Sequence, residues 1–334
     1  MRVLYELFVI LSNKILVAQI RAVCLNTHEV NMIKSVAHEF SSKYEWLNLR
    51  LNDVTSTEVS ALFGVNPYLT EFELFHMKKN KQIVNIEQNE RMKWGTRLES
   101  AIAEGIAEER GWVIQKMNHY LNNPDYRIGA SFDYFGWADN PENNFILEVK
   151  NVDYFQYKDK WIDDGINLEA PPHIELQVQT QMMLAGCDIA YICALVAGNE
   201  SIVIERKKNA DIQRAILKRV KQFWIDIETN KAPAPNFERD SQLIISMNQS
   251  VDENSIAQAD DELTALASEY KLQSELERSA QKKKEELKAK IFMKINTAEK
   301  VKGERFTITA SVVAPAEISF KRDAYRTFKV NWRK

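Results

Sequence analysis

The run Ile146-Leu147-Glu148-Val149-Lys150 is the strongest chemical signal in the sequence. Side chains of a β-strand alternate between its two faces. We therefore expect Glu148 and Lys150 to share one face, while Leu147 and Val149 point into the core. An acid and a base on one face of an apolar strand are costly unless they are paired or used in chemistry. An ordinary ion pair on a solvated face is the competing interpretation.

Asp133 lies fifteen residues before Glu148, and the segment Asn140-Pro141-Glu142-Asn143 between them is typical of a turn. The two strands would then form a hairpin that places Asp133 beside Glu148. Two carboxylates at 4 Å repel by roughly 4 kcal/mol at an effective dielectric constant near 20. A divalent cation removes that repulsion. With a backbone carbonyl, assigned to Val149, and water, the two acids suit Mg²⁺, and Mn²⁺ is an alternative.

Lys150 could then orient and help to deprotonate a metal-bound water, or neutralise charge on a scissile phosphate. This combination predicts in-line attack on a phosphodiester. The residue types and spacing alone do not exclude an acid–base enzyme such as a glycosidase, which would use Asp133 and Glu148.

Glu99 is a third acid, on a predicted helix where it shares one face with Ile102, Ala103 and Ile106. A carboxylate on such a face needs a partner. A metal-bound water or a second metal would serve, and so would a salt bridge to a buried Arg or Lys.

Two amides, Gln177 and Gln181, are i, i+4 neighbours on a later helix. They could hold a nucleophilic water or a phosphate oxygen, although glutamines are also common on amphipathic helices.

The elements that must position these residues follow from periodicity and from turn residues. The order helix, three strands, helix, strand predicts an α/β fold with a mixed central sheet. Thr55 and Glu58 have capping-box spacing, which predicts a short helix ending near Gly64. We expect helices over 34–50, 90–110, 173–185, 210–229 and 262–300, and strands over 112–121, 126–137, 144–151, 189–197 and 201–205.

Composition and charge bound the alternatives. The chain has 334 residues, 45% of them hydrophobic, which suits one catalytic domain of ~200 residues with extensions. Residues 271–334 hold 17 Lys and Arg against 8 Asp and Glu, so a basic tail follows an acidic body. Such a tail could bind a polyanion, or it could be a solvated helix face.

Several classes of site are disfavoured. Three cysteines without a Cys-x-x-Cys pair indicate a reduced protein and argue against an iron–sulfur cluster. The histidines lack zinc-site spacing, and no phosphate-binding P-loop occurs. Residues 1–23 are too charged for a membrane span, no signal-peptide cleavage site follows, and Met32 is an alternative start.

The order Glu99, Asp133, Glu148-Val149-Lys150 and Gln177-Val178-Gln179 resembles the lambda-exonuclease, or YqaJ-type viral recombinase, branch of the PD-(D/E)xK nucleases. The likeness covers about residues 45–210. Trp94-Gly95-Thr96-Arg97-Leu98-Glu99 is similar to the helix motif of this family that ends in an acidic ligand. Ala130-Ser131-Phe132-Asp133 is similar to its Ser-Pro-Asp step, with Phe132 in place of Pro.

The resemblance also implies a site for a 5′-phosphate. Trp46-Leu47-Asn48-Leu49-Arg50 followed by Thr55-Ser56-Thr57-Glu58 resembles the segment that grips this group in the family. Arg50 would be the phosphate arginine, with Thr57, where the family usually has Ser, as the hydroxyl donor. Free N–H groups at a helix N-terminus favour anions. The assigned phosphate ligands are Arg50, Ser56, Thr57, Ser131 and Gln179.

The resemblance also implies a fold, an activity, partners and a location that the spacing of residues alone does not give. It implies a restriction-endonuclease-like PD-(D/E)xK core and a Mg²⁺-dependent 5′→3′ exonuclease acting on double-stranded DNA ends. It also implies a homotrimer, a single-strand-annealing partner, and a phage- or prophage-encoded protein of the bacterial cytosol, not bound to membrane. The predicted division is an N-terminal extension over 1–40, a nuclease domain over 41–230, a linker over 231–261, and a C-terminal helix with a β unit over 262–334.

Two other functions are also compatible with these residues. One is a site-specific endonuclease of the same superfamily, which would cut closed circles. The other is a DNA-end-binding scaffold with a vestigial site.

Overall fold

The computed structural model describes residues 34–83, 88–317, 326–328 and 330. The described residues fall into two compact units that divide between Leu243 and Ile244. Residues 1–33, and with them most of the predicted N-terminal extension, lie outside the described residues, as does part of the alternating segment at 328–330.

A five-stranded mixed sheet forms the centre of the first unit, in the order β11-β10-β7-β6-β3. Strand β7 pairs in parallel with β10 and antiparallel with β6, and the other neighbours are antiparallel. The α/β fold with a mixed sheet that the sequence predicts is therefore confirmed. The strands are β3 (Val113–Lys116), β6 (Tyr134–Trp137), β7 (Asn144–Val152), β10 (Ile189–Val196) and β11 (Glu200–Lys207).

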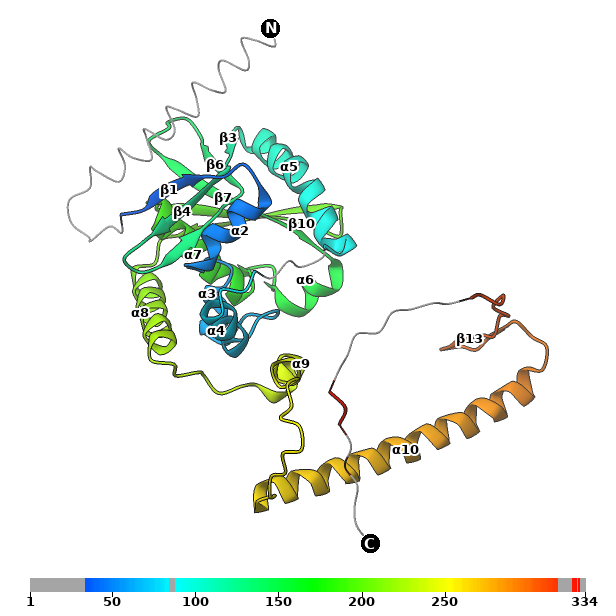
Figure 1. Cartoon of the computed structure of the whole chain (residues 1–334). Coiled ribbons are helices and arrows are strands. Elements are labelled where there is room, and N and C mark those ends of the chain that lie inside the picture. Colours follow the sequence, from blue (N-terminus) through cyan, green and yellow to red (C-terminus); the bar gives the residue numbers. More distant parts are fainter. Residues whose placement is uncertain (1–33, 84–87, 318–325, 329, 331–334) are drawn as a thin grey trace. The chain divides into compact units, whose positions relative to one another are not determined.

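Helices cover both faces of this sheet (Figure 1). The apolar stripe Ile102, Ala103 and Ile106 of α5 (Glu90–Arg110) packs against Leu147 and Val149 of β7. On the other face, α7 (Pro172–Ala185) and α8 (Ala210–Glu228) pack against a larger core. The chain order α5, the three central strands β3, β6 and β7, then α7 and β10 is the helix, three strands, helix, strand order that the sequence predicts.

The ends of α5 and α7 follow from local chemistry. Asn89 caps α5 through its side chain, which accepts a hydrogen bond from Met92 N, and Gly111 ends it with a φ of 66°. Pro172 opens α7, and Gly186 ends it with a φ of 71°. Only glycine adopts such positive φ values without steric cost, so both helices stop where the sequence predicts.

A second, four-stranded sheet has the order β1-β4-β5-β2, and its strands β4 and β5 come between β3 and β6 of the central sheet along the chain. The sequence predicts single strands over 112–121 and 126–137. In the structure each stretch divides between the two sheets, after Lys116 and after Ala130. The second break places Ser131 and Asp133 at the junction of the sheets. The strands are β1 (Val36–Glu39), β2 (Val54–Thr55), β4 (His119–Asn123) and β5 (Ile128–Ala130).

The helix predicted over 34–50 is wrong in its first half. Residues Val36–Glu39 form β1, which pairs with β4, and the helix α2 spans Lys43–Leu51. The side chain of Ser42 caps α2 by accepting from Glu45 N. The pairing partner of β1 lies some eighty residues further along the chain, so local periodicity could not reveal it.

The helices and strands not yet placed are mostly short. The predicted linker contains α9, and the division of the chain into domains stays a prediction. These elements are α3 (Val59–Leu62), α4 (Glu71–Lys79), α6 (Tyr154–Lys160), α9 (Phe237–Met247), β8 (Ile162–Asp163) and β9 (Leu168–Glu169).

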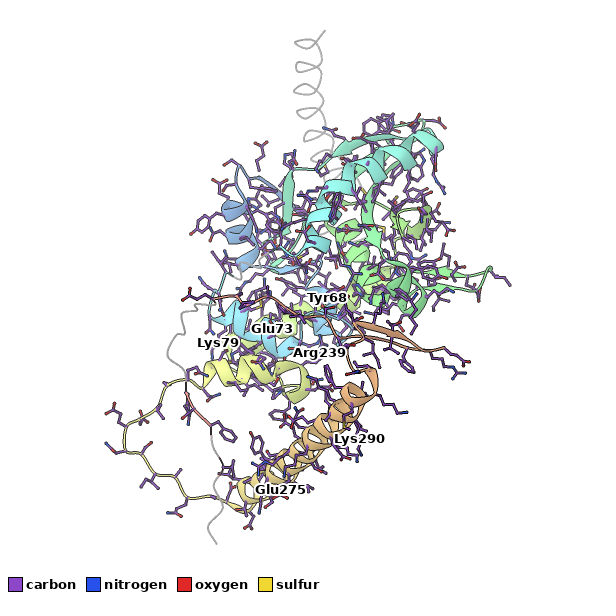
Figure 2. All side chains as sticks on the ribbon, turned by 90° about the vertical axis from the view of Figure 1, so that its right-hand side faces the viewer. Tyr68, Glu73, Lys79, Arg239, Glu275 and Lys290 are labelled. Atoms are coloured by element: carbon purple, nitrogen blue, oxygen red, sulfur yellow. The ribbon has the colours of Figure 1, made fainter. Side chains whose placement is uncertain are left out.

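The second unit contains the 35-residue helix α10 (Asp261–Ile295), which begins at the cap Asp260. None of its residues, all of which the structure describes, is buried. Figure 2 shows Glu275 and Lys290 extending from it. A hairpin of β12 (Lys300–Lys302) and β13 (Thr307–Thr309) follows, as the alternation near Phe306 indicates.

No helix among the described residues is long and apolar enough to cross a membrane.

A substitution at Gly129 of β5 would test how closely this strand packs against the Tyr120 side chain. A Cβ at this position would lie 2.0 Å from the Tyr120 hydroxyl oxygen, and Tyr120 is fully buried. We expect Gly129→Ala to lower the free energy of unfolding by about 1–3 kcal/mol, because overpacking forces neighbouring groups to shift. The measurement is urea denaturation.

The matched control is Gly105→Ala on α5, where a Cβ meets no atom within 4 Å. It should be neutral or stabilise by up to about 1 kcal/mol. Equal effects of the two substitutions would contradict the packing at Gly129.

Candidate active site

Glu148 is the centre of a buried hydrogen-bond network on β7. Its side chain is on the α7 face of the sheet, while Leu147 and Val149 are on the α5 face. Glu148 is 3% exposed. Its Oε1 accepts from Gln177 Nε2 at 2.7 Å and from Lys150 Nζ, and its Oε2 accepts from Gln181 Nε2 at 2.7 Å. A solvated ion pair is thereby excluded for this acid.

Asp133 lies directly across the hairpin from Glu148. The antiparallel register pairs Tyr134 with Leu147, so Asp133, one residue before Tyr134, lies opposite Glu148, one residue after Leu147. Asp133 Oδ2 accepts a hydrogen bond from Val149 N at 2.8 Å. Burial and the charge of Glu148 raise the pKa of Asp133 to about 8, although Lys150 and the Val149 N–H act in the opposite sense. The predicted side-by-side placement of the two acids is therefore present.

Lys150 completes the cluster from the same strand face. Its Nζ donates to Glu148 and lies 3.4 Å from Gln177 Oε1. Burial lowers the pKa of Lys150, but the charges of Glu148 and Asp133 outweigh this and raise it overall. The amine is thus held as an ammonium ion, which can bind a phosphate oxygen.

Gln177 and Gln181, the i, i+4 pair that the sequence singles out, both lie beside Glu148, while Gln179 does not. Gln179 Nε2 donates to Glu175 and to Lys207 O, and its Oε1 accepts from Asn209 N, so it is engaged elsewhere. Successive residues turn by about 100° on a helix, so residues two apart lie on different faces. The assignment of Gln179 to the phosphate site is therefore corrected. The i, i+4 relation to Gln177 was the signal for Gln181.

Glu99 is placed differently from the expectation of a three-acid centre. Its Oε1 pairs with Lys116 Nζ of β3 at 3.0 Å. Among the residues that the structure describes, no three His, Cys, Asp or Glu side chains are arranged to hold a metal ion. The charge of Glu99 still raises the pKa of Asp133, so the two lie in one neighbourhood. A salt bridge, the alternative that the sequence left open, is present, but its partner Lys116 is half exposed and not a buried base as expected.

The donors at Asp133 and Glu148 fit a hard divalent cation. Two adjacent carboxylates repel each other, as the raised pKa of Asp133 records. Gln181 Oε1 is buried and without a hydrogen-bond partner in the described part of the chain, which adds an oxygen acceptor beside Glu148. Val149, predicted to supply its carbonyl, donates its N–H to Asp133. Oxygen donors of this kind are the ligands that Mg²⁺ prefers.

The predicted phosphate residues form a second cluster at the end of α2. Arg50 Nη2 lies 3.3 Å from both Thr55 Oγ1 and Thr57 Oγ1, and its guanidinium group lies 4.3 Å above the Trp46 ring. Ser56, between the two threonines, is buried, and its N–H donates to Gly129 O. The structure thus places Thr57 and Thr55 beside Arg50 and leaves Ser56 outside the hydrogen bonds of the guanidinium.

The local helix contributes less to this cluster than expected. Glu58 does reach back to Thr55 N at 2.9 Å, which is half of a capping box. However, α3 begins only at Val59 and has four residues. Because a helix dipole grows from aligned peptide units, the positive charge here comes from Arg50.

A buried ion pair supports the cluster from below. Lys78 of α4 contacts Glu58 Oε2 at 2.7 Å and donates to Arg50 O at 2.9 Å. Both side chains are almost inaccessible, at 3% and 12% exposure. Glu58 also accepts from Thr55 N. The Glu58–Lys78 pair therefore fixes both Arg50 at the end of α2 and the segment 55–58 that follows it. Sequence patterns gave no sign of this pair.

Ser131 connects the two clusters. Its Oγ accepts from Trp46 Nε1 at 3.0 Å, and its carbonyl accepts from Gln181 Nε2 at 3.0 Å. Trp46 in turn packs under Arg50. Ser131 is therefore placed between the catalytic acids and the arginine.

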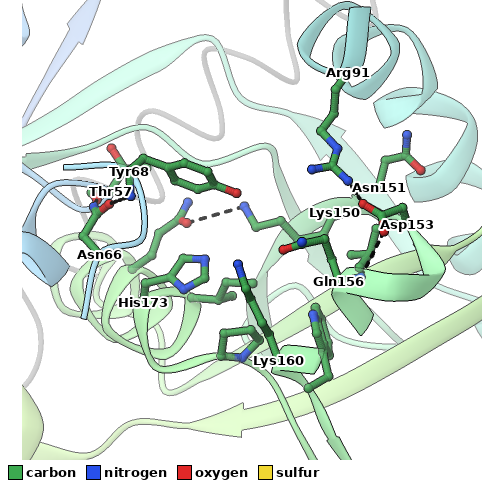
Figure 3. A pocket seen from close by; sticks show the side chains of 15 residues that line it. Thr57, Asn66, Tyr68, Arg91, Lys150, Asn151, Asp153, Gln156, Lys160 and His173 are labelled. Carbon is green, nitrogen blue, oxygen red and sulfur yellow. Dashed lines mark hydrogen bonds and ion pairs between the residues drawn. The ribbon is translucent and has the colours of Figure 1, made fainter. Parts of the chain in front are cut away.

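Each cluster contributes lining residues to one pocket of about 320 Å³ (Figure 3), although Arg50, Asp133 and Glu148 do not line it themselves. Thr57 lines it at one end, and Lys150 and Gln177 line it nearer the acids. His173 also faces it, and burial with the charges of Lys150 and Lys160 lowers the pKa of this imidazole to about 4. His173 is consequently neutral at physiological pH, and the charged side chains that line the pocket are Arg91, Lys150, Asp153 and Lys160.

Residues 45–188 match the family described as YqaJ-like viral recombinase domain. This part of the chain is therefore similar to YqaJ-like viral recombinase domains. The chain is also 27% identical to the protein YqaJ of Bacillus subtilis (strain 168) over 197 residues, which is 58% of this chain. The match spans 59% of the length of that relative. The resemblance stated from the sequence is confirmed.

Two solved structures show weaker likenesses. An alkaline exonuclease (LHK-Exo) from Laribacter hongkongensis is 19% identical, with a TM-score of 0.45, over 61% of this chain and 100% of that one. A phage-related exonuclease from Haemophilus somnus 129PT is 14% identical, with a TM-score of 0.36, over 58% and 91%. We draw nothing about this chain from likenesses of this size.

The raised pKa of Asp133 makes a prediction for stability. Its value rises from 3.8 in the unfolded chain to about 8 in the metal-free fold. Between these values the folded state holds a proton that the unfolded state lacks, so stability falls as pH rises from about 4 to 8. Asp133→Asn should remove this loss and stabilise the metal-free protein by about 1–3 kcal/mol at pH 9.

The measurement is denaturation with EDTA at pH 4 and pH 9. Near pH 4 the acid is protonated in the fold and about half protonated in the unfolded chain, so the gain should be small. A variant that is less stable than wild type at pH 9 would contradict the electrostatic interpretation of this site.

Proposed function

We propose that the chain is a metal-dependent DNA nuclease, and more finely a Mg²⁺-dependent 5′→3′ exonuclease acting on double-stranded ends. The observation that carries this proposal is that Thr57, beside Arg50, lines the same pocket as Lys150 and Gln177. A pocket that is lined by Thr57 of the arginine cluster and by Lys150, which pairs with Glu148, suits a phosphodiester near a phosphorylated end. The match of residues 45–188 to the YqaJ-like viral recombinase family supports an enzyme that acts on DNA.

Each group has a task in this reaction. Asp133, Glu148 and the Val149 carbonyl would hold the cation, which supplies Lewis acidity and an activated water when bound. Lys150 Nζ neutralises negative charge on the scissile phosphate. Gln177, which bonds both Glu148 and Lys150, keeps these two side chains in register. Glu99 reaches the centre through bound water once Lys116 releases it.

The 5′-phosphate would lie against Arg50. Its guanidinium presents N–H donors, and Thr55 and Thr57 add hydroxyl groups. Ser131 holds Trp46, on which Arg50 stacks, and is a positioning residue in this proposal. An arginine fork matches phosphate geometry better than a lysine does.

The remaining features come from the family resemblance. We propose a homotrimer, resection to 3′ single-strand overhangs, a single-strand-annealing protein as partner, and a phage or prophage origin with action in the bacterial cytosol. The PD-(D/E)xK core also serves endonucleases and binding proteins, so the first experiment must separate these activities.

The decisive assay is digestion of linear duplex DNA with 5′-phosphates, beside a closed circle, in Mg²⁺ and in EDTA. We expect mononucleotide release from the linear DNA in Mg²⁺ alone. Lys150→Ala should lower the rate at least about 100-fold, because it removes a charge that acts in the transition state, while DNA binding persists. Lys208→Ala, which only removes an ion pair with Asp188, is the control and should digest normally.

Three outcomes contradict this prediction. Cutting of the closed circle would favour an endonuclease. Binding without any cleavage by wild type would favour a scaffold. Normal turnover by Lys150→Ala would refute the role of the ammonium group.

Arg50→Ala tests the phosphate end of the pocket. We expect the preference for 5′-phosphorylated over 5′-hydroxyl ends to fall about 10- to 100-fold, since a charge-assisted hydrogen bond to phosphate contributes about 1.5–3 kcal/mol. The readout is the initial rate on the two kinds of end.

The exposed Arg214→Ala on α8, where Arg214 pairs with Asp211, provides the control for a lost positive charge. If Arg50→Ala keeps the wild-type ratio of rates, Arg50 does not bind the phosphate.

A further inference from the structure

Large aromatic side chains are exposed where α5 and α6 begin. Phe155 is 80% exposed, Trp94 is 50% exposed and Tyr154 is 47% exposed. An ion pair between Arg91 of α5 and Asp153, the cap residue of α6, joins the two helix starts (Figure 3). Exposed apolar surface that gathers in one place beside polar groups is a mark of binding surfaces, and the ion pair brings the helix starts that carry these rings together.

Cations accompany these rings. The Arg97 guanidinium lies 5.0 Å from the centre of the Trp94 ring, and Lys158 Nζ lies 4.9 Å from the centre of the Tyr154 ring. Phe155 meets Tyr154 edge to face, with ring centres 6.0 Å apart. We call Trp94, Tyr154 and Phe155, with Arg97 and Lys158, the aromatic platform.

The platform is continuous with the active-site pocket. Arg91 and the α6 residues Gln156 and Lys160 line that pocket together with Lys150. Helix α6 therefore presents amide and ammonium groups to the pocket, while Phe155, one position before Gln156, faces solvent. A chain that leaves the pocket along α6 passes the platform next.

We propose that the aromatic platform binds unpaired bases of a single DNA strand whose backbone enters the pocket. This inference rests on the proposed function. Aromatic rings and cations together match the alternation of bases and phosphates in single-stranded nucleic acid. Bases within a duplex are stacked on one another, so their faces cannot reach Phe155 or Tyr154. The platform thus selects strands that have been opened near the scissile bond.

Binding of single strands, measured in EDTA so that none is cut, tests the inference. The probes are a fluorescent oligonucleotide of about 12 nucleotides, a duplex of equal length, and an equal strand with abasic sites throughout. Phe155→Ala and Tyr154→Ala should each weaken binding of the intact single strand about tenfold, because one stacked base contributes about 1–3 kcal/mol. Duplex binding should stay unchanged.

The abasic strand makes the assignment specific to stacking. Wild type and Phe155→Ala should bind it with the same affinity, because no base is present to stack on the ring. Phe155→Trp should bind the intact strand as wild type does. The matched control is Phe237→Ala on α9, whose side chain is 75% exposed outside the platform. It should leave all three affinities unchanged.

Unchanged affinity of Phe155→Ala and Tyr154→Ala for the intact strand would overturn the inference. Equal losses for duplex or abasic strands would also overturn it, and would indicate a duplex or backbone contact instead. Wild type that binds no single strand overturns it as well, and leaves a protein partner as the occupant. If wild type binds through the platform but cuts no linear DNA, the proposed function fails and this inference stands. If it cuts DNA and the variants bind normally, only this inference fails.

Discussion

The proximity of Asp133 and Glu148 is the constraint on which the rest of the site depends. Two carboxylates that share one face of a buried hairpin are unfavourable unless other groups offset the charge. The protein surrounds Glu148 with Lys150, Gln177 and Gln181, and it gives Asp133 the Val149 N–H. These donors come from the same strand and from α7, so the docking of α7 on the sheet and the chemistry of the site are one structural requirement.

The two functional clusters come from different parts of the fold, and the break after Ala130 brings them together. At this break the chain leaves the smaller sheet and enters the central one. Ser131 therefore contacts Trp46 by its side chain and Gln181 by its carbonyl. If the same residues formed one straight strand, the carbonyl of Ser131 would point along the regular hydrogen-bond direction of that sheet. The break frees it to accept from Gln181 while the side chain accepts from Trp46.

Sequence patterns predicted the elements whose signals are local. The alternation at 144–151 and the turn at 140–143 were enough to place Asp133 opposite Glu148. The stripe at Ile102 and Ile106 placed α5, and the glycines at its end and at the end of α7 placed their last turns. These features depend on neighbours within one or two turns or one hairpin, which a single sequence records.

Features that depend on distant partners could not be predicted in this way. The pairing of β1 with β4 replaced half of a predicted helix, and two predicted strands divided between sheets. Gln179 and Gln181 are equally polar, and only the docking of α7 decides which faces Glu148. Glu99 meets Lys116 because α5 and β3 pack together, which periodicity does not show.

The ion pair of Glu58 and Lys78 has a consequence for ionic strength. Mobile ions screen charges that face solvent but act little on pairs enclosed by the protein. The proposed contacts between Arg50 and a phosphate would release counterions and weaken as salt is added. The last turn of α2, which carries Arg50, is held by the enclosed pair, so its shape should persist at salt concentrations that would release bound DNA. Dissociation at high ionic strength would then be fully reversible, because the empty site keeps its geometry.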